Sequence, residues 1–164
     1  MAGIRLGVAF AAPEVAHLLN CIKAPYNISS PASALASKCL SDEGLEVMRC
    51  NVNEILKQRD LFVESLQRLR KTRKAGMPGV GNIIGGLDAN FILLQIVSGE
   101  GQPDNELAQK LYITLAETKG VVVRYRGMER GCKGSLRITV GTEKEMETLV
   151  SRLEEWQNSH NQEN

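Results

Sequence analysis

Apolar residues recur along this chain with two different periods, and the two periods predict where its helices and strands lie. The longest helical pattern runs from Leu45 to about Arg70, where apolar residues fall at spacings of three and four with one gap near Arg59. Helix-start signals, such as a capping serine or threonine and a proline in the first turn, predict four shorter helices. These begin at Pro13, near Ser30–Pro31, at Asp104 or Asn105, and at Thr142.

Short apolar runs, several of them rich in β-branched residues, predict the strands. The four runs are Leu6–Ala11, Asn90–Val97, Val121–Val123 with Arg124 at its end, and Leu136–Val140. From residue 87 to residue 156 the predicted order is therefore β-α-β-β-α. This order indicates a small α+β layer in which helices pack on a mainly antiparallel sheet. The chain as a whole is predicted to belong to the α/β class.

The run Leu6–Ala11 is unusual because no other element precedes it. It is apolar on both faces, which is typical of a strand inside a sheet. A single central strand cannot satisfy its own backbone N–H and C=O groups. The strand is therefore expected either to pair with a later part of the chain or to belong to a sheet in sequence outside it.

The stretch from Gly76 to Gly86 contains five glycines and Pro78. The phosphate-binding signature GxxxxGK[ST] is absent there, and GVGNIIG is not followed by a helix pattern. We therefore interpret this stretch as a flexible connection between two substructures. The polar residues from Gln157 onward predict a frayed tail.

Composition and charge exclude several classes of protein. The 164 residues are 43% hydrophobic and 24% charged, which is typical of a globular protein long enough to bury a core. The net charge of +1 argues against strong attraction to nucleic acid or membrane. No apolar run approaches the ~18–20 residues of a spanning helix, and the N-terminus is a poor secretory signal. Four cysteines without metal-type spacing indicate reduced thiols in a cytosolic protein: Cys21, Cys39, Cys50 and Cys132.

Arg124 and Arg137 are the candidate binding residues, because each lies in or at the end of a short strand of the same predicted sheet. Two guanidinium groups on neighbouring strands can converge on one carboxylate or phosphate. The alternative is two unrelated surface arginines. A basic run, Arg68–Lys74, is interpreted as a solvated helix end. No nucleophile–base pair or paired carboxylates are recognisable.

The segment GSLRITVGT, preceded by GVVVRYRG and LDANFILLQI, resembles the C-terminal small domain of histidinol-phosphate aminotransferases. These are pyridoxal-phosphate enzymes of the fold-type I aminotransferase superfamily. Upstream, AGIRLGVAFAAPEVAHLLNCIKAPYNISSPASALA resembles the segment that directly follows the cofactor-binding lysine. The resemblance covers roughly Ala2–Trp156 with all motifs in family order. It implies a large-domain remnant at 1–44, a connecting helix and linker at 45–86, a small domain at 87–156, and a tail at 157–164.

The resemblance also implies roles for four residues. Arg5, in AGIRLG, matches the arginine that contacts the phosphate of pyridoxal 5'-phosphate; a strand arginine paired with an acidic neighbour is the alternative. Arg137 matches the arginine that receives the substrate's anionic group and the carboxylate of the amino donor. Arg124 matches a second arginine that holds the substrate phosphate. Tyr26 matches a tyrosine near the partner subunit's active site, or one that merely packs at the dimer interface.

The implied enzyme is a cytoplasmic homodimer of histidine biosynthesis that moves an amino group between L-histidinol phosphate and 2-oxoglutarate. In the family, a lysine that bonds covalently to the cofactor precedes AGIRLG, and no lysine precedes that motif here. Lys23 and Lys38 lie in the wrong context to replace it. The chain alone is therefore expected to be inactive, as the product of a truncated gene model, a split gene or a degenerate paralogue.

Two other functions stay open at this point. A non-catalytic anion-binding or assembly module would also need the two arginines. A related aminotransferase with another amino-acid substrate is the third reading, since LRIT-type motifs are shared. In each case the apolar sides of the first helices are expected to be exposed, so that the isolated chain aggregates or is partly unfolded.

Overall fold

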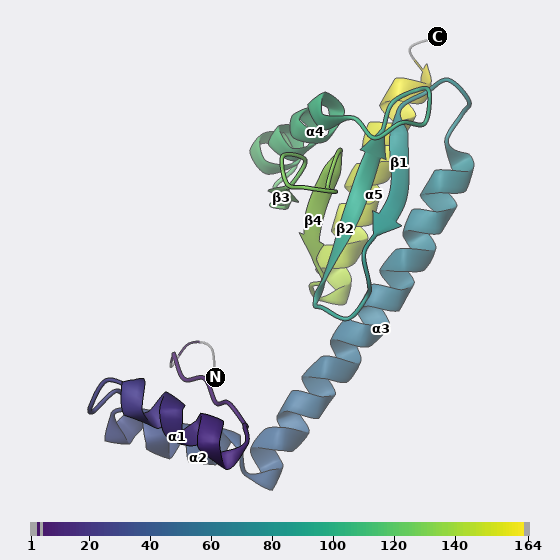
Figure 1. The fold of residues 1–164 in the computed structure, drawn as a ribbon. Helices are drawn as coiled ribbons and strands as arrows, with labels where there is room; N and C mark the ends of the chain where they lie inside the picture. Colours follow the sequence, from purple (N-terminus) through teal and green to yellow (C-terminus); the bar gives the residue numbers. More distant parts are fainter. Residues whose placement is uncertain (1–2, 4, 163–164) are drawn as a thin grey trace. The chain divides into compact units, whose positions relative to one another are not determined.

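The computed structural model describes residues 3 and 5–162 and divides the chain into two compact units, Met1–Val52 and Asn53–Asn164. The first unit contains α1 (Pro13–Ile22) and α2 (Ser30–Cys39). The long helix α3 (Asp42–Thr72) contributes residues to both units. All remaining elements belong to the second unit (Figure 1).

The helices of the first unit begin where the sequence signals predict. Pro13 occupies the first turn of α1. The hydroxyl oxygen of Ser29 accepts a hydrogen bond from the backbone N–H of Ala32 at 3.3 Å, so the cap of α2 is Ser29 and not Ser30. Ala36 is the one hydrophobic residue that is buried among the described residues of this unit. The unit therefore has almost no hydrophobic core of its own.

Residues Leu6–Ala11 form no strand in the described structure and nearly all of them are exposed, so the predicted pairing with a later part of this chain is wrong. The alternative, a sheet in sequence outside this chain, stays a prediction. A strand exists only where a neighbouring strand accepts and donates its backbone hydrogen bonds. The described residues of the first unit contain helices and connections but no strand that could pair with it. Without that partner, the apolar run stays an irregular segment in which Phe10 is 97% exposed.

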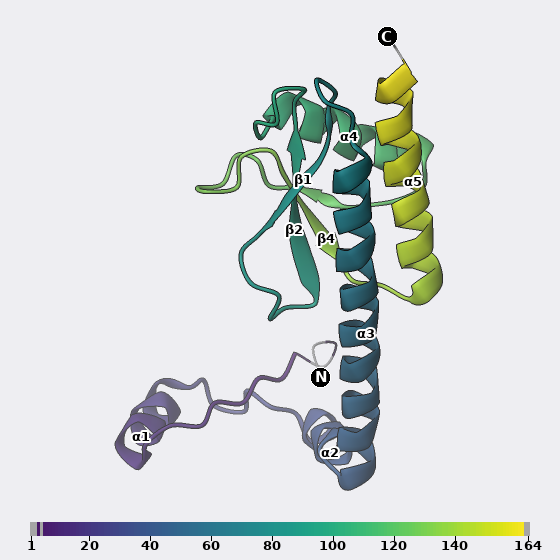
Figure 2. The same cartoon turned by 90° about the vertical axis from the view of Figure 1, so that its right-hand side faces the viewer.

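The second unit is a four-stranded antiparallel sheet with the order β1-β2-β4-β3. Its strands are β1 (Gly79–Ile84), β2 (Phe91–Val97), β3 (Arg124–Tyr125) and β4 (Ser135–Thr139), and its two further helices are α4 (Asn105–Thr118) and α5 (Glu143–Gln162). The order β2-α4-β3-β4-α5 confirms the predicted β-α-β-β-α layer. Figure 2 views the sheet nearly edge-on and shows α3 and α5 on one side of it.

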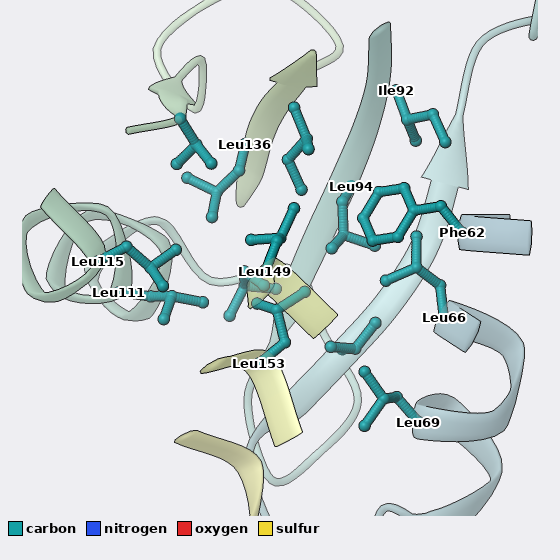
Figure 3. Close-up of a cluster of buried hydrophobic side chains, with 14 of the residues drawn as sticks. Phe62, Leu66, Leu69, Ile92, Leu94, Leu111, Leu115, Leu136, Leu149 and Leu153 are labelled. Atoms are coloured by element: carbon teal, nitrogen blue, oxygen red, sulfur yellow. The ribbon is translucent and has the colours of Figure 1, made fainter. Parts of the chain in front are cut away.

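One face of the sheet is buried under the helices and forms the core. Burial alternates along β2, where Ile92, Leu94 and Ile96 are fully buried and the residues between them are only half-buried. The second half of α3, together with α4 and α5, supplies the facing side chains (Figure 3). These include Phe62, Leu66, Leu69, Leu111, Leu115, Leu149 and Leu153. The opposite face of the sheet carries no helix of the described part of this unit.

The glycine-rich stretch is the first strand of the sheet, which corrects its interpretation as a flexible linker. Gly79 pairs with Val97, and Ile84 pairs with Leu93. A Cβ atom at position 81 would lie 2.6 Å from Cγ1 of Val97, so glycine permits the close approach of β1 to β2. Tertiary pairing with a strongly apolar neighbouring strand overrides the low strand propensity of glycine.

The polar tail is also corrected, because α5 continues to Gln162 and the side chain of Gln157 is 1% exposed. The predicted caps are present. The Asp104 carboxylate accepts a hydrogen bond from the N–H of Leu107 at 3.0 Å, and the Glu145 carboxylate accepts one from the N–H of Thr142 at 2.8 Å. The run Val121–Val123 is not part of β3, which is limited to two residues.

Candidate anion-binding site

The pairing of β3 with β4 places Arg124 directly opposite Arg137. Side chains of directly opposed residues in an antiparallel pair leave the sheet on the same face, with their Cβ atoms about 4.5–5.5 Å apart. The two long guanidinium side chains therefore start from neighbouring points on one surface. The neighbouring strands that the sequence predicted for them are present, and the convergence of both groups on one anion stays a prediction.

The face on which the two arginines lie follows from the alternation along β4. Leu136 and Ile138 are buried in the core beneath the helices. Arg137 stands between them, so its side chain leaves on the opposite face, which no helix of this unit covers. Leu93, which pairs with Arg137 from β2, is half-buried on the same open face. The sheet thus presents a charged pair beside Leu93 on its open face.

Arg137 is held more closely than an ordinary surface arginine. Its guanidinium carbon lies 5.3 Å from the centre of the Phe91 ring, within the range of a cation–π contact. Its Nε atom is buried and has no hydrogen-bond partner in the described structure. The terminal nitrogens Nη1 and Nη2 are not among the buried unpartnered atoms, so these two donors remain accessible.

Arg124 is exposed, and no carboxylate among residues 5–162 forms an ion pair with Arg124 or Arg137. Both guanidinium groups are permanently charged, and like charges directly opposed on a sheet repel each other by roughly 0.5 kcal/mol. The arrangement opposes folding slightly and favours an anion that bridges the two groups. Arg126, two residues further along, is different because its guanidinium pairs with Glu129 at 2.6 Å.

Asn105 and Gly134 fix the loop between β3 and β4. The side-chain oxygen of Asn105 accepts a hydrogen bond from the N–H of Gly134 at 2.6 Å. Gly134 lies immediately before β4. Its φ of +69° is a backbone conformation that favours glycine. Asn105 was predicted only as part of a helix start, and Phe91 only as part of a strand. The sequence gives no signal that either residue acts beside the arginines.

Arg124 and Arg137 belong to the second unit, whereas Arg5 and Tyr26 belong to the first. Both have positive φ, +56° and +55°, which is uncommon for residues other than glycine. Tyr26 is fully exposed, and Arg5 makes no hydrogen bond or ion pair with any described residue. A free guanidinium fits the phosphate group that the resemblance assigns to Arg5.

Other candidate sites carry less chemistry. In the basic run at the end of α3, the Arg73 guanidinium donates to the carbonyl of Met77 at 2.8 Å and to that of Ser98 at 3.3 Å, so it braces two loops. A hollow of about 470 Å³ lies beside Val121–Val123 and the start of α5. Neither Arg124 nor Arg137 lines this hollow. Among the described residues no group of histidines, cysteines and carboxylates is arranged to hold a metal ion.

A family model described as aminotransferase class I and II matches residues 1–153. The chain therefore belongs to the class I and II aminotransferase family, and its α/β fold is the fold of that family's C-terminal portion. Across residues 3 and 5–162 no helix is long and apolar enough to cross a membrane.

Within this family the chain is similar to histidinol-phosphate aminotransferases, which confirms the resemblance drawn from the LRIT and AGIRLG motifs. It is 44% identical to the enzyme from Candida maltosa over 99% of this chain and 39% of that protein. It is 44% identical to the enzyme from Saccharomyces cerevisiae over 94% of this chain and 37% of that protein. The chain thus spans less than two-fifths of the length of these relatives.

Two solved structures share the fold. The histidinol-phosphate aminotransferase from Clostridium acetobutylicum superposes with a TM-score of 0.67 at 22% identity, over 89% of this chain and 38% of that one. The enzyme from Sinorhizobium meliloti, solved in complex with pyridoxal-5'-phosphate, gives a TM-score of 0.65 at 18% identity, over 90% of this chain and 35% of that one.

Proposed function

We propose that this chain forms the C-terminal part of a histidinol-phosphate aminotransferase. The complete enzyme moves an amino group between L-histidinol phosphate and 2-oxoglutarate, giving imidazole acetol phosphate and glutamate in histidine synthesis. The observation that carries the proposal is the opposed pair Arg124 and Arg137, which has no carboxylate partner among the described residues. The 44% identity to the Candida maltosa enzyme supports the choice of substrate.

One pair of arginines can serve both substrates, because a guanidinium donates two parallel hydrogen bonds to a carboxylate or to a phosphate. Arg137 receives the phosphate of histidinol phosphate in one half-reaction and a carboxylate of glutamate in the other. Arg124 strengthens the binding of the phosphate, which carries more negative charge than a carboxylate. By binding the far anionic end of each substrate, the pair orients the reacting carbon, and such positioning lowers a barrier by several kcal/mol.

The family implies pyridoxal 5'-phosphate as cofactor, and Arg5 is the residue of this chain that suits it. When bound, this cofactor withdraws electrons from the substrate carbon that carries the amino group. Arg5 supplies a fixed positive charge and a donor fork for the cofactor phosphate. We assign Tyr26 to the surface that meets a partner subunit in a cytoplasmic homodimer, because its side chain is fully exposed.

A chimera tests the proposal, with this chain replacing the matched 39% of the Candida maltosa protein. The chimera is expected to transfer the amino group of histidinol phosphate to 2-oxoglutarate. Arg137→Ala should raise the KM for both substrates by roughly 10- to 100-fold, the loss of a hydrogen bond to a charged group. Arg124→Ala should raise the KM for histidinol phosphate more than that for 2-oxoglutarate.

Arg126→Ala is the matched control, because it removes the same charge two residues after Arg124 while its guanidinium is already paired with Glu129. Unchanged kinetics for both substrates in Arg137→Ala would remove that residue from the site. A chimera that prefers aromatic amino acids as donors would identify a related aminotransferase. A chain that binds phosphate but never supports transamination would be a non-catalytic anion-binding module. The isolated 164-residue chain is expected to be inactive under each of these readings.

A further inference from the structure

Phe91 is the first residue of β2, and strand register places it beside Arg137. β2 pairs with β4 so that Phe91 opposes Thr139 and Leu93 opposes Arg137. Phe91 is therefore the diagonal neighbour of Arg137 on the open face of the sheet, within reach of a long side chain. The guanidinium carbon of Arg137 lies 5.3 Å from the centre of the Phe91 ring, so the two side chains are in contact.

The contact decides which edge of the guanidinium is available. An arginine side chain has four rotatable bonds, and an unrestrained one presents any of its donors. Here Nε is shielded from solvent and has no partner in the described structure, whereas Nη1 and Nη2 stay accessible. The fork made by the two terminal nitrogens is the one that a ligand can meet.

We propose that Phe91 is a positioning residue that holds Arg137 with its Nη1–Nη2 edge toward the ligand anion. The inference deepens the proposed function and rests on it for the identity of the anion. The ligand class is an oxyanion with two oxygens that meet the fork end-on, either a carboxylate or a phosphate. Phe91 itself does not contact the reacting atoms.

The same geometry divides the work between the two arginines. Arg137 has an aromatic contact and a shielded Nε, so its position is fixed before the ligand arrives. Arg124 is exposed and has no aromatic contact in the described part of the chain. Arg137 thus supplies the fixed contact common to both anions, and Arg124 moves to match the larger or the smaller one.

The test uses the complete 164-residue chain with isotope-labelled arginine, kept below the concentration at which it self-associates. Nuclear magnetic resonance follows the Nε–Hε signal of Arg137, and a titration with inorganic phosphate gives the dissociation constant. In the wild type the Hε proton should exchange slowly with water, because Nε is shielded. Phe91→Leu should speed that exchange and weaken phosphate binding about three- to fivefold, the value of an exposed cation–π contact.

Phe91→Tyr keeps an aromatic face and should restore both readouts. Leu93→Val is the matched control, because it trims an apolar side chain directly opposite Arg137 without touching the ring contact. The melting temperature of each variant reports any loss of folding separately. A Phe91→Leu variant with an unchanged Hε exchange rate, or with an unchanged phosphate affinity, would overturn the inference.

Failure of the proposed function gives a different result. If the wild-type chain binds no phosphate, the anion-binding function fails, and the Hε exchange of Phe91→Leu alone decides whether the ring positions Arg137. If the wild type binds phosphate and Phe91→Leu matches it in both readouts, the anion-binding function stands and the role of Phe91 falls.

Discussion

The side chain of Gln157 replaces a missing backbone partner for Val80. Its oxygen Oε1 accepts a hydrogen bond from the buried N–H of Val80 at 3.1 Å. Its nitrogen Nε2 donates to the carbonyl of Leu69 at 2.8 Å, one of the last carbonyls of α3. These carbonyls accept no backbone hydrogen bond within their own helix, and that of Leu69 also accepts one from the hydroxyl of Thr72 at 3.0 Å. One glutamine of α5 therefore joins the end of α3 to the start of β1 inside the core.

Gln157→Ala should lower the free energy of unfolding by about 1–3 kcal/mol, because it leaves the buried N–H of Val80 without a partner. The Leu69 carbonyl would keep its second donor, the hydroxyl of Thr72. Chemical denaturation followed by circular dichroism measures the change. Asn158→Ala, at an exposed position of the same helix, is the control and should change stability by less than about 0.5 kcal/mol. Equal effects of the two substitutions would show that the Gln157 bridge contributes nothing specific.

Because Arg124 faces Arg137, we expect its replacement to stabilise the fold and to weaken anion binding. Arg124→Thr removes one of two facing positive charges and should raise the free energy of unfolding by roughly 0.2–0.5 kcal/mol. The gain should shrink in high salt, because salt screens the repulsion. Phosphate binding should weaken at the same time. A variant that is both less stable and unchanged in phosphate affinity would contradict an anion-binding role for the pair.

The N-terminus of α5 should make stability depend on pH. Hydrogen bonds from the backbone and the side chain of Thr142 lower the pKa of Glu145 below its ordinary value of 4.5. A carboxylate with a lowered pKa contributes stability above its unfolded value, and that contribution is lost as the pH falls through its folded value. The melting temperature of Glu145→Gln should therefore fall less than that of the wild type between pH 5 and pH 2, because the glutamine side chain does not titrate.

Glu154→Gln, at an exposed position of α5, is the control for this measurement and should follow the wild-type curve. Superimposable curves for the wild type and Glu145→Gln across the acid range would show that the Thr142–Glu145 contact has no energetic role.

The first unit should make the isolated chain self-associate. Its helices expose large apolar side chains, such as Leu18 at 64% and Ile22 at 81%, and bury almost none. Sedimentation velocity should show oligomers that increase with concentration, and the double substitution Leu18→Gln and Ile22→Gln should reduce them. Val122→Thr, which removes an apolar side chain of the second unit that is 71% exposed, should leave association unchanged. A monodisperse wild-type monomer would refute this prediction.

The amino-acid sequence predicted β2, α4, β4 and the start of α5, because the signals for these elements are local. Asp104 and Thr142 mark helix starts through hydrogen bonds that span three residues. The apolar run Asn90–Val97 predicted a strand, and only the structure shows which of its side chains face the core. The motifs around Arg124 and Arg137 identified the two candidate binding residues. The assignment of residues 1–44 to a larger cofactor-binding domain stays a prediction.

Only the tertiary structure decided the features that depend on partners far along the chain. The glycines of β1 form a strand because β2 pairs with them, and the apolar run Leu6–Ala11 forms none because the described residues of its unit offer no pairing strand. Gln157 is polar and near the end of the sequence, yet it is buried because two buried backbone groups need its amide. Likewise, Phe91 becomes the neighbour of Arg137 through strand register across 46 residues of chain. Hydrophobic periodicity and helix capping depend on residues a few positions apart and can be recognised in the sequence. Hydrogen-bond pairing and strand register depend on segments far apart in the chain and require the tertiary structure.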